Sequence, residues 1–336
     1  MEIRKSFACA VCVSLILLAA IAVPRSAAAQ APDNPTIAFT ANAEGGNIWL
    51  MDSDGKNQRP ILEIKGNPVP LGLVWSPDGN KLAFHTEIRK NIDVYLVNAN
   101  GENLRQLTNH EAEDSWPNWH PGGQKIAFAT NRDGNFEIYE MTSRGEVLQN
   151  ITNDAVYDSY PAWSRDGRNI AFSSIRGKTL GDIWVMDASG ENLKNLTNHR
   201  AEDFRPRWSP DSQKIAWLSR RTGRGHVYVM DADGENFLQI VKPPSSEKRD
   251  PEWSPDGKKI ACVHFAGNIA SIRIFEADVK EQDAEFVEIL PAIGFPNRAP
   301  AWFDPDFVKP FSVSPVEKRI LAWGWLKQAG DMFSGR

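Results

Sequence analysis

In several runs along this chain, apolar residues alternate with polar or aromatic ones at a spacing of two. Examples are Val94-Tyr-Leu-Val97 and Ile183-Trp-Val-Met186. β-Branched and aromatic residues dominate these runs, and a period of two is typical of strands with one buried face. Apolar residues do not repeat at helical spacing. The pattern therefore predicts an all-β protein.

The predicted strands belong to a repeat that begins with a tryptophan and a turn, as in Trp75-Ser-Pro-Asp-Gly. The turn residues suit their places, because proline presets φ and Asp-Gly accepts left-handed conformations. A short apolar strand, an alternating strand, a hairpin turn and a fourth strand follow. The six motif tryptophans, spaced 44, 44, 45, 45 and 49 residues apart, are Trp75, Trp119, Trp163, Trp208, Trp253 and Trp302. Four antiparallel strands repeated six times predict a six-bladed β-propeller, with these tryptophans packed between blades.

The order of strands at the two ends predicts how the ring closes. The chain opens on the second strand of a blade, at Ile37, and supplies a first strand six times, the last around Trp302. We expect these N- and C-terminal strands to pair, which leaves no open sheet edge. The propeller is then expected to span residues 30–306, followed by a tail of uncertain structure at 307–336.

Residues 1–29 have the pattern of a cleaved signal peptide. Arg4 and Lys5 precede an apolar run of 17 residues from Phe7 to Val23, and Ala27-Ala-Ala29 supplies small residues for a peptidase. A membrane anchor is the alternative, but the run is marginal for spanning a bilayer. We therefore expect a periplasmic or secreted protein that is not embedded in a membrane.

Composition narrows the classes of partner. The chain has 38 Lys+Arg and 43 Asp+Glu. Without the basic surplus that phosphate backbones require, nucleic acid is not expected as a partner. Loss of residues 1–29 would leave Cys262 as the single cysteine, so no intramolecular disulfide is expected, and this thiol should be buried. A closed propeller has no need to oligomerise, and we expect a monomer.

The repeat also resembles a known family. The pattern Trp-Ser-Pro-Asp-Gly-x-x-Ile-Ala-Phe, followed by Ile-Tyr-x-Met-Asp-x-x-Gly and Leu-Thr, is similar to the TolB-like β-propeller repeat over residues 37–302. The resemblance implies the propeller fold and a scaffold role in the bacterial envelope. TolB has an α/β domain before its propeller, whereas only residues 30–36 stand between the expected cleavage site and the first strand. A relative without that domain is the expectation.

Binding is expected on one face of the propeller. The Ser-Pro-Asp-Gly and Asp-x-x-Gly turns are short and uniform, and they share one face, the turn face. The opposite, crossing-loop face is formed by the blade-to-blade segments and the loops between second and third strands, which vary in length and charge, as binding loops do. Residues three to five positions before each motif tryptophan begin the innermost strands there. The candidate binding residues are Asp114, Trp116, Asp158, Tyr160, Asp203, Arg205, Arg249, Asp250 and Arg298.

Two readings of these candidates stay open. Arginine and aromatic side chains are strong anchors for a polar partner. The regular recurrence of Asp114, Asp158 and Asp203 equally fits a structural role, in which they hydrogen-bond the backbone of neighbouring blades.

The sequence contains no catalytic motif and no convergent set of metal ligands. His85 and His264 follow second strands and could approach the axis, but they lack a third ligand. We therefore expect a non-catalytic scaffold, without cofactor or metal, that binds an envelope protein, peptide or polysaccharide. The alternative is a hydrolase or lyase acting on a sugar or lactone at the channel mouth. It would need histidines and carboxylates that meet at one axial point.

Overall fold

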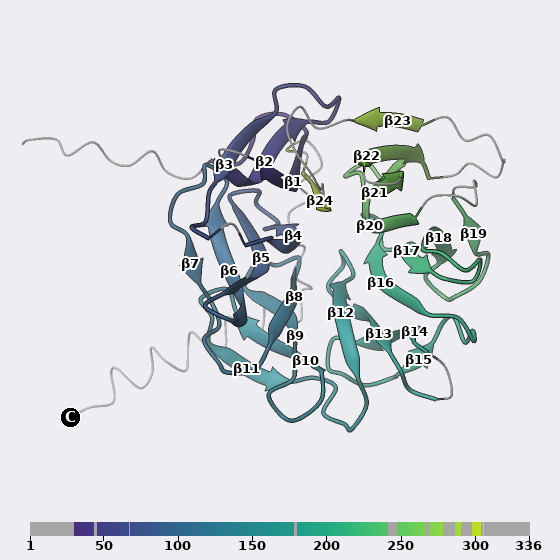
Figure 1. Cartoon of the computed structure of the whole chain (residues 1–336). Helices are drawn as coiled ribbons and strands as arrows, with labels where there is room; N and C mark the ends of the chain where they lie inside the picture. Colours follow the sequence, from purple (N-terminus) through teal and green to yellow (C-terminus); the bar gives the residue numbers. More distant parts are fainter. Residues whose placement is uncertain are drawn as a thin grey trace, which may run out of the picture.

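The computed structural model is a ring of six four-stranded antiparallel sheets around a central axis (Figure 1). It describes residues 30–43, 46–66, 68–177, 180–240, 247–266, 269–277, 286–289, 298–303 and 305. This part of the chain contains no helix that could cross a membrane. The expected signal peptide at 1–29 and the tail at 307–336 lie outside the described residues. The six-bladed all-β propeller expected from the repeat is confirmed.

In blades 2 to 6 the four strands follow one another in chain order, from the axis outward (Figure 1). Blade 2 contains β4 (Leu71–Trp75), β5 (Lys81–Ile88), β6 (Asn91–Asn98) and β7 (Arg105–Gln106), and blade 3 contains β8 (Asp114–Trp119), β9 (Lys125–Thr130), β10 (Glu137–Thr142) and β11 (Val147–Asn150). Blade 4 contains β12 (Asp158–Trp163), β13 (Asn169–Ser174), β14 (Asp182–Asp187) and β15 (Lys194–Asn195). Blade 5 contains β16 (Asp203–Trp208), β17 (Lys214–Ser219), β18 (His226–Asp231) and β19 (Leu238–Gln239), and blade 6 contains β20 (Glu247–Trp253), β21 (Lys259–Ala266), β22 (Ile269–Glu276) and β23 (Phe286–Ile289).

Blade 1 joins the two ends of the propeller. Its sheet has the order β24 (Arg298–Phe303), β1 (Thr36–Ala43), β2 (Gly46–Asp52) and β3 (Arg59–Leu62). β24 pairs antiparallel with β1, and Ile37 lies opposite Trp302. The last strand of the repeat therefore completes the blade that the first strand began, as expected.

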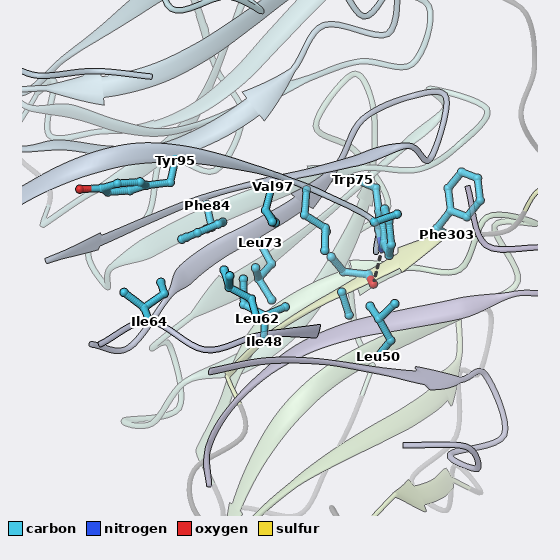
Figure 2. Packing of buried hydrophobic residues seen from close by; sticks show 14 residues of the cluster. Ile48, Leu50, Leu62, Ile64, Leu73, Trp75, Phe84, Tyr95, Val97 and Phe303 are labelled. Atoms are coloured by element: carbon cyan, nitrogen blue, oxygen red, sulfur yellow. Dashed lines mark hydrogen bonds between the residues drawn. The ribbon is translucent and has the colours of Figure 1, made fainter. Parts of the chain in front are cut away.

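The hydrophobic core lies between blades. Figure 2 shows Ile48 and Leu50 of blade 1 packed with Phe84 and Val97 of blade 2 in one buried cluster. Burial of such side chains stabilises the fold by about 1.5–3 kcal/mol each. The motif tryptophans add a polar link: the indole N–H of Trp75 donates to the carbonyl of Ala301, one blade back, at 3.1 Å.

The same link recurs at other blade junctions. Trp208 donates to the carbonyl of Ala162, and Trp253 donates to that of Arg207, each at 3.1 Å. All six motif tryptophans are buried. Their expected packing between blades is confirmed, and Cys262 is buried as expected.

Candidate binding site on the central axis

The innermost strands of blades 2 to 6 share an irregular position, three residues before the motif tryptophan. The register with the second strand shifts there. The residue at this position has a positive φ: 62° at Gly72, 53° at Trp116, 56° at Tyr160, 56° at Arg205 and 54° at Asp250. Such a bulge re-aims a side chain. Outside glycine, a left-handed conformation costs about 1–3 kcal/mol, so four blades retain a strained residue at the same place.

These four strained residues meet, although they come from four blades. The guanidinium carbon of Arg205 lies 4.4 Å from the ring centroid of Trp116 and 5.2 Å from that of Tyr160. The two rings are 4.5 Å apart. Arg205 also forms an ion pair with Asp250. Trp116, Tyr160, Arg205 and Asp250, here called the axial cluster, thus converge on the axis, where each cation–π contact contributes about 0.5–2 kcal/mol.

His85, at the centre of β5, packs against Trp116 of the axial cluster. Its ring lies 4.4 Å from that of Trp116, and its Nδ1 accepts a hydrogen bond from the backbone N–H of Trp116 at 3.2 Å. Burial, with a smaller effect of the nearby Arg205 charge, lowers the pKa of His85 to about 3. His85 is therefore a neutral acceptor that positions Trp116.

The other expected histidine, His264, lies apart from the axial cluster. His264 is buried in blade 6, where its Nδ1 lies 3.5 Å from the hydroxyl of Ser271. Within the described ranges, no three His, Cys, Asp or Glu side chains are grouped as a metal ion requires. The axial cluster contributes one carboxylate, that of Asp250, and it is already paired with Arg205.

The three recurring aspartates lie in the interior instead of on the rim. Asp114, Asp158 and Asp203 are fully buried. Each accepts from an arginine eighteen residues later in the same blade, in the loop after the second strand. The pairs are Asp114–Arg132 at 2.9 Å, Asp158–Arg176 at 2.6 Å and Asp203–Arg221 at 2.7 Å. Burial closes these carboxylates to direct contact with a partner. Each of these carboxylates holds an arginine from a loop of its own blade.

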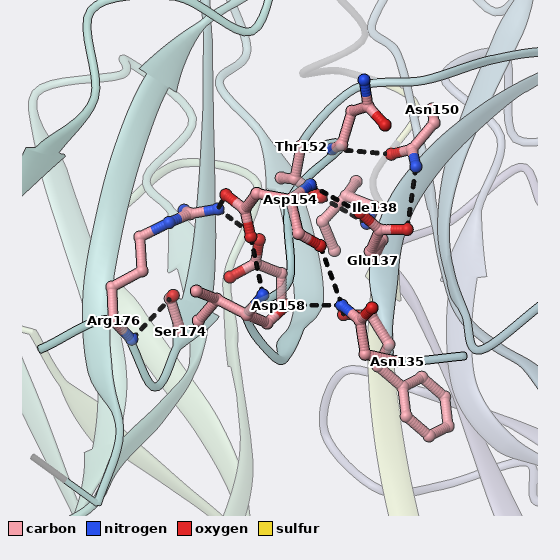
Figure 3. A network of polar contacts seen from close by, with 12 residues as sticks. Asn135, Glu137, Ile138, Asn150, Thr152, Asp154, Asp158, Ser174 and Arg176 are labelled. Atoms are coloured by element: carbon pink, nitrogen blue, oxygen red, sulfur yellow. Dashed lines mark hydrogen bonds and ion pairs between the residues drawn. The ribbon is translucent and has the colours of Figure 1, made fainter. Parts of the chain in front are cut away.

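A polar network fixes the crossing segment between blades 3 and 4 (Figure 3). Arg176 joins Asp158 to Asp154 of this segment. Asn135 donates to the backbone carbonyl of Asp154 at 3.1 Å, and the backbone N–H of Asp154 donates to Glu137 at 2.7 Å. Burial raises the pKa of Asp158 to about 6, although Arg176 opposes that shift. The segment that leads into Tyr160 is therefore held from both blades.

Sequence reasoning did not find the acidic residues near the start of the third strands of blades 2, 3 and 4. Glu137 has equivalents in Asp93 and Asp182, whose carboxylates accept from the threonine of the Leu-Thr motif. These bonds are Thr108 to Asp93 at 3.2 Å and Thr197 to Asp182 at 3.1 Å. The signal was present in the sequence, as an acidic residue just before the alternating strands of blades 2, 3 and 4.

Two hollows lie at opposite ends of the axis. On the crossing-loop face, a cleft of about 880 Å³ extends outward over blade 2, and both His85 and Trp116 line its inner end. On the turn face, a hollow of about 310 Å³ is lined by turn prolines such as Pro77 and Pro210. The larger opening thus adjoins the axial cluster. Arg249 and Arg298 lie in β20 and β24, but their side chains are outside the described part.

Comparisons with solved structures show the same architecture elsewhere. TolB from Acinetobacter baumannii is 25% identical, with a TM-score of 0.70 over 81% of this chain and 67% of that one. A candidate TolB from Agrobacterium tumefaciens is 19% identical, with a TM-score of 0.61 over 80% of this chain and 98% of that one. A chain of a nidogen/laminin complex is 10% identical, with a TM-score of 0.66 over 81% and 99%. The last two likenesses show the fold alone.

Sequence comparison gives the family. No curated protein matches the chain. The profile of the TolB beta propeller domain matches residues 29–181 and again residues 150–307, which together cover the whole propeller. The chain belongs to the TolB β-propeller domain family.

Proposed function

We propose that this protein is an exported, non-catalytic scaffold that binds a protein of the bacterial envelope through its crossing-loop face, with the axial cluster at the centre of the contact. The supporting observation is the cluster itself: four blades each hold a strained residue so that two aromatic rings, an arginine and a carboxylate meet on the axis. Strain of this kind persists where the surrounding fold enforces it, and it gathers at functional sites. Membership of the TolB β-propeller family supports a binding role.

The chemistry of the axial cluster favours recognition. Tryptophan, tyrosine and arginine are the residues most often found as binding hot spots. The side chain of Arg205 is 17% exposed and is already oriented by two rings and Asp250, so little side-chain entropy is lost when a partner contacts it. A group of the partner could stack on Trp116, or an acidic group could replace Asp250 beside the guanidinium of Arg205. In either case the partner would meet a preformed surface.

The alternative, a hydrolase or lyase acting on a sugar or lactone, has less support. Such chemistry needs a base whose pKa is near the working pH, in reach of a second titratable group. His85, which contacts Trp116 of the axial cluster, has a pKa of about 3, and its Nδ1 accepts a hydrogen bond from the backbone N–H of Trp116. The carboxylate of the axial cluster, that of Asp250, is paired with Arg205. Glu252, which lines the turn-face hollow, is paired with Arg207.

Capture of partners from envelope extract tests the proposal. We would compare the native protein with a W116A/Y160A/R205A variant and with an R165A/K258A control, which changes two exposed side chains on the turn face. Loss of hot-spot residues worth about 2 kcal/mol or more predicts at least roughly 30-fold weaker capture by the axial variant and no change for the control.

Thermal unfolding of all three proteins would show that each is folded. Equal capture by the native protein and a folded axial variant would overturn the assignment of this face. Capture of no protein by the native chain would favour the enzymatic alternative, and screens on sugars and lactones would follow.

A further inference from the structure

The hairpin of β5 and β6 is longer than its counterparts in the next three blades. Its strands have eight residues each, whereas β9, β10, β13, β14, β17 and β18 have six. Pairing continues to Ile88 opposite Asn91, so Arg89 and Lys90 alone form the turn. The hairpin thus extends the crossing-loop face of blade 2 and ends in two exposed cations.

The two turn residues at this tip are unusual for their backbone conformation. Arg89 has a φ of 54° and Lys90 a φ of 70°. A two-residue hairpin turn with positive φ at both positions strongly favours Asn-Gly or Asp-Gly, because long side chains are strained there. In blades 3 to 5, glycines supply positive φ in the equivalent loops, at Gly134, Gly177 and Gly223. Blade 2 therefore keeps two charged residues at the expense of backbone strain, which is a mark of function.

The hairpin is one wall of the 880 Å³ cleft. The opposite wall is the crossing segment from blade 1, and the lining is largely apolar: Ile64, Pro68, Val69, Leu71, Ile88 and Ile92. The cleft opens onto the axial cluster because of Gly72. A Cβ at this position would lie 3.0 Å from Nδ1 of His85 and 3.3 Å from Cε3 of Trp116. The missing side chain lets both rings line the inner end of the cleft.

Charge is distributed unevenly along the cleft. Lys65 and Arg89 line it, and Lys90 stands beside them at the hairpin tip; all three are exposed. No ion pair among the described residues includes any of these three cations. Glu87 and Glu113 also line the cleft, and burial raises the pKa of Glu113. The outer rim thus presents cations that an acidic group can approach, while the floor suits an apolar side chain.

We infer that this cleft binds an extended segment of the partner protein that places an apolar side chain on the floor and acidic side chains against Lys65, Arg89 and Lys90. The inference rests on the proposed function and names the chemistry of the partner. The apolar lining favours a peptide over an anionic polysaccharide, which has charge but no apolar side chain to bury. Arg89 and Lys90 then act as specificity determinants, because charged rims select partners by complementary charge.

Selection from a display library tests the inference with peptides of random sequence as the probe. Peptides of roughly 12 residues can span about 40 Å when extended. The purified native protein would be the bait, and the selected pool would then be measured against three variants. R89N/K90G removes both cations and gives the turn its favoured residues, W116A/Y160A/R205A removes the axial cluster, and R144N/K258N removes two exposed cations from the turn face.

We expect the native protein to enrich peptides in which acidic residues flank a large apolar one. R89N/K90G should bind this pool roughly tenfold more weakly, with a melting temperature at or above that of the native protein. The loss should shrink as salt is added, because exposed charges are screened. R144N/K258N should bind as the native protein does, since it has the same change in net charge at the wrong face.

The other outcomes separate this inference from the proposed function. A pool that needs the axial cluster but is indifferent to R89N/K90G, or that has no acidic excess, would overturn the inference and leave the proposed function standing. A pool indifferent to both sets of changes, or no pool at all, would overturn both. Alginate that binds through Arg89 and Lys90, with no acidic peptide enriched, would replace the peptide by a polyanionic sugar.

Discussion

The Asp203–Arg221 pair allows a test of how the blades hold their loops. The carboxylate of Asp203 is fully buried and accepts from Nη2 of Arg221 at 2.7 Å. The side chain of Arg221 is 13% exposed. Its guanidinium carbon also lies 5.6 Å from the ring centroids of Trp217 and Tyr228 and 5.2 Å from that of Phe237. The pair therefore joins β16 to the loop after β17 inside an aromatic cage.

Replacement of Asp203 by alanine would leave the guanidinium nearly buried without its carboxylate. Loss of one partner from a buried pair costs about 3–5 kcal/mol. Because Arg221 retains some exposure, we expect the lower end, roughly 3 kcal/mol, from a total stability of about 5–15 kcal/mol. For a domain of this size, that corresponds to a fall in melting temperature of roughly 6–12 °C.

Calorimetry and urea unfolding would measure the change beside two comparison variants. Asp233→Ala removes an exposed aspartate whose side chain accepts the backbone N–H of Glu235 at 3.0 Å, and it should cost no more than about 1 kcal/mol. D203L/R221M exchanges the pair for apolar side chains and should recover most of the loss. If Asp203→Ala were as mild as Asp233→Ala, the buried pair would not stabilise the blade and the reasoning would fail.

Two further predictions concern a turn and the pH dependence of stability. Gly101→Ala should cost about 3 kcal/mol or more of stability, because φ is +85° and a Cβ would lie 1.7 Å from the carbonyl oxygen of Ile61. Gly66→Ala is the control: φ is +87° but the space is open, so it should cost about 1 kcal/mol. Similar losses for the two variants in urea unfolding would contradict this prediction. His85, with a pKa of about 3, stays neutral in the folded protein, whereas in the unfolded chain it takes up a proton near its ordinary pKa of about 6.5. Its contribution to the free energy of unfolding is therefore complete above pH 6.5 and falls by about 1.4 kcal/mol per pH unit towards pH 3. His85→Asn should remove this slope. Stability is compared between the variant and the native protein at each pH, because the raised pKa of Asp158 acts in the opposite direction in both. A stability difference that stays constant between pH 6 and 4 would refute the prediction.

The sequence alone determined the architecture, because the signals for it are local and repeated. Alternation fixes strands, the Ser-Pro-Asp-Gly turns fix their ends, and the spacing of the motif tryptophans fixes the number of blades. The position of the first and last strands also predicted that β24 would close the ring on β1. Each of these features depends on neighbours within one repeat or on simple counting of repeats.

The site depended on contacts between blades, and these only the tertiary structure decided. The sequence placed Trp116, Tyr160, Arg205 and Asp250 at equivalent positions, but it did not reveal the bulge that turns them inward or the contact of Arg205 with two adjoining rings. The same spacing left open whether Asp114, Asp158 and Asp203 contact a partner or have a structural role, and the structure buries them against arginines eighteen residues away.

The physical reason is that a repeat position fixes which strand a residue occupies but not how deeply its side chain is buried. Whether a carboxylate such as Asp203 faces a partner or an arginine is decided by the charge that the next loop brings over it. The neighbouring blades decide whether the strained residue of one blade lies alone on the axis or contacts other side chains there. Residues more than forty positions apart in the chain set the stack, so it could not be read from any one repeat.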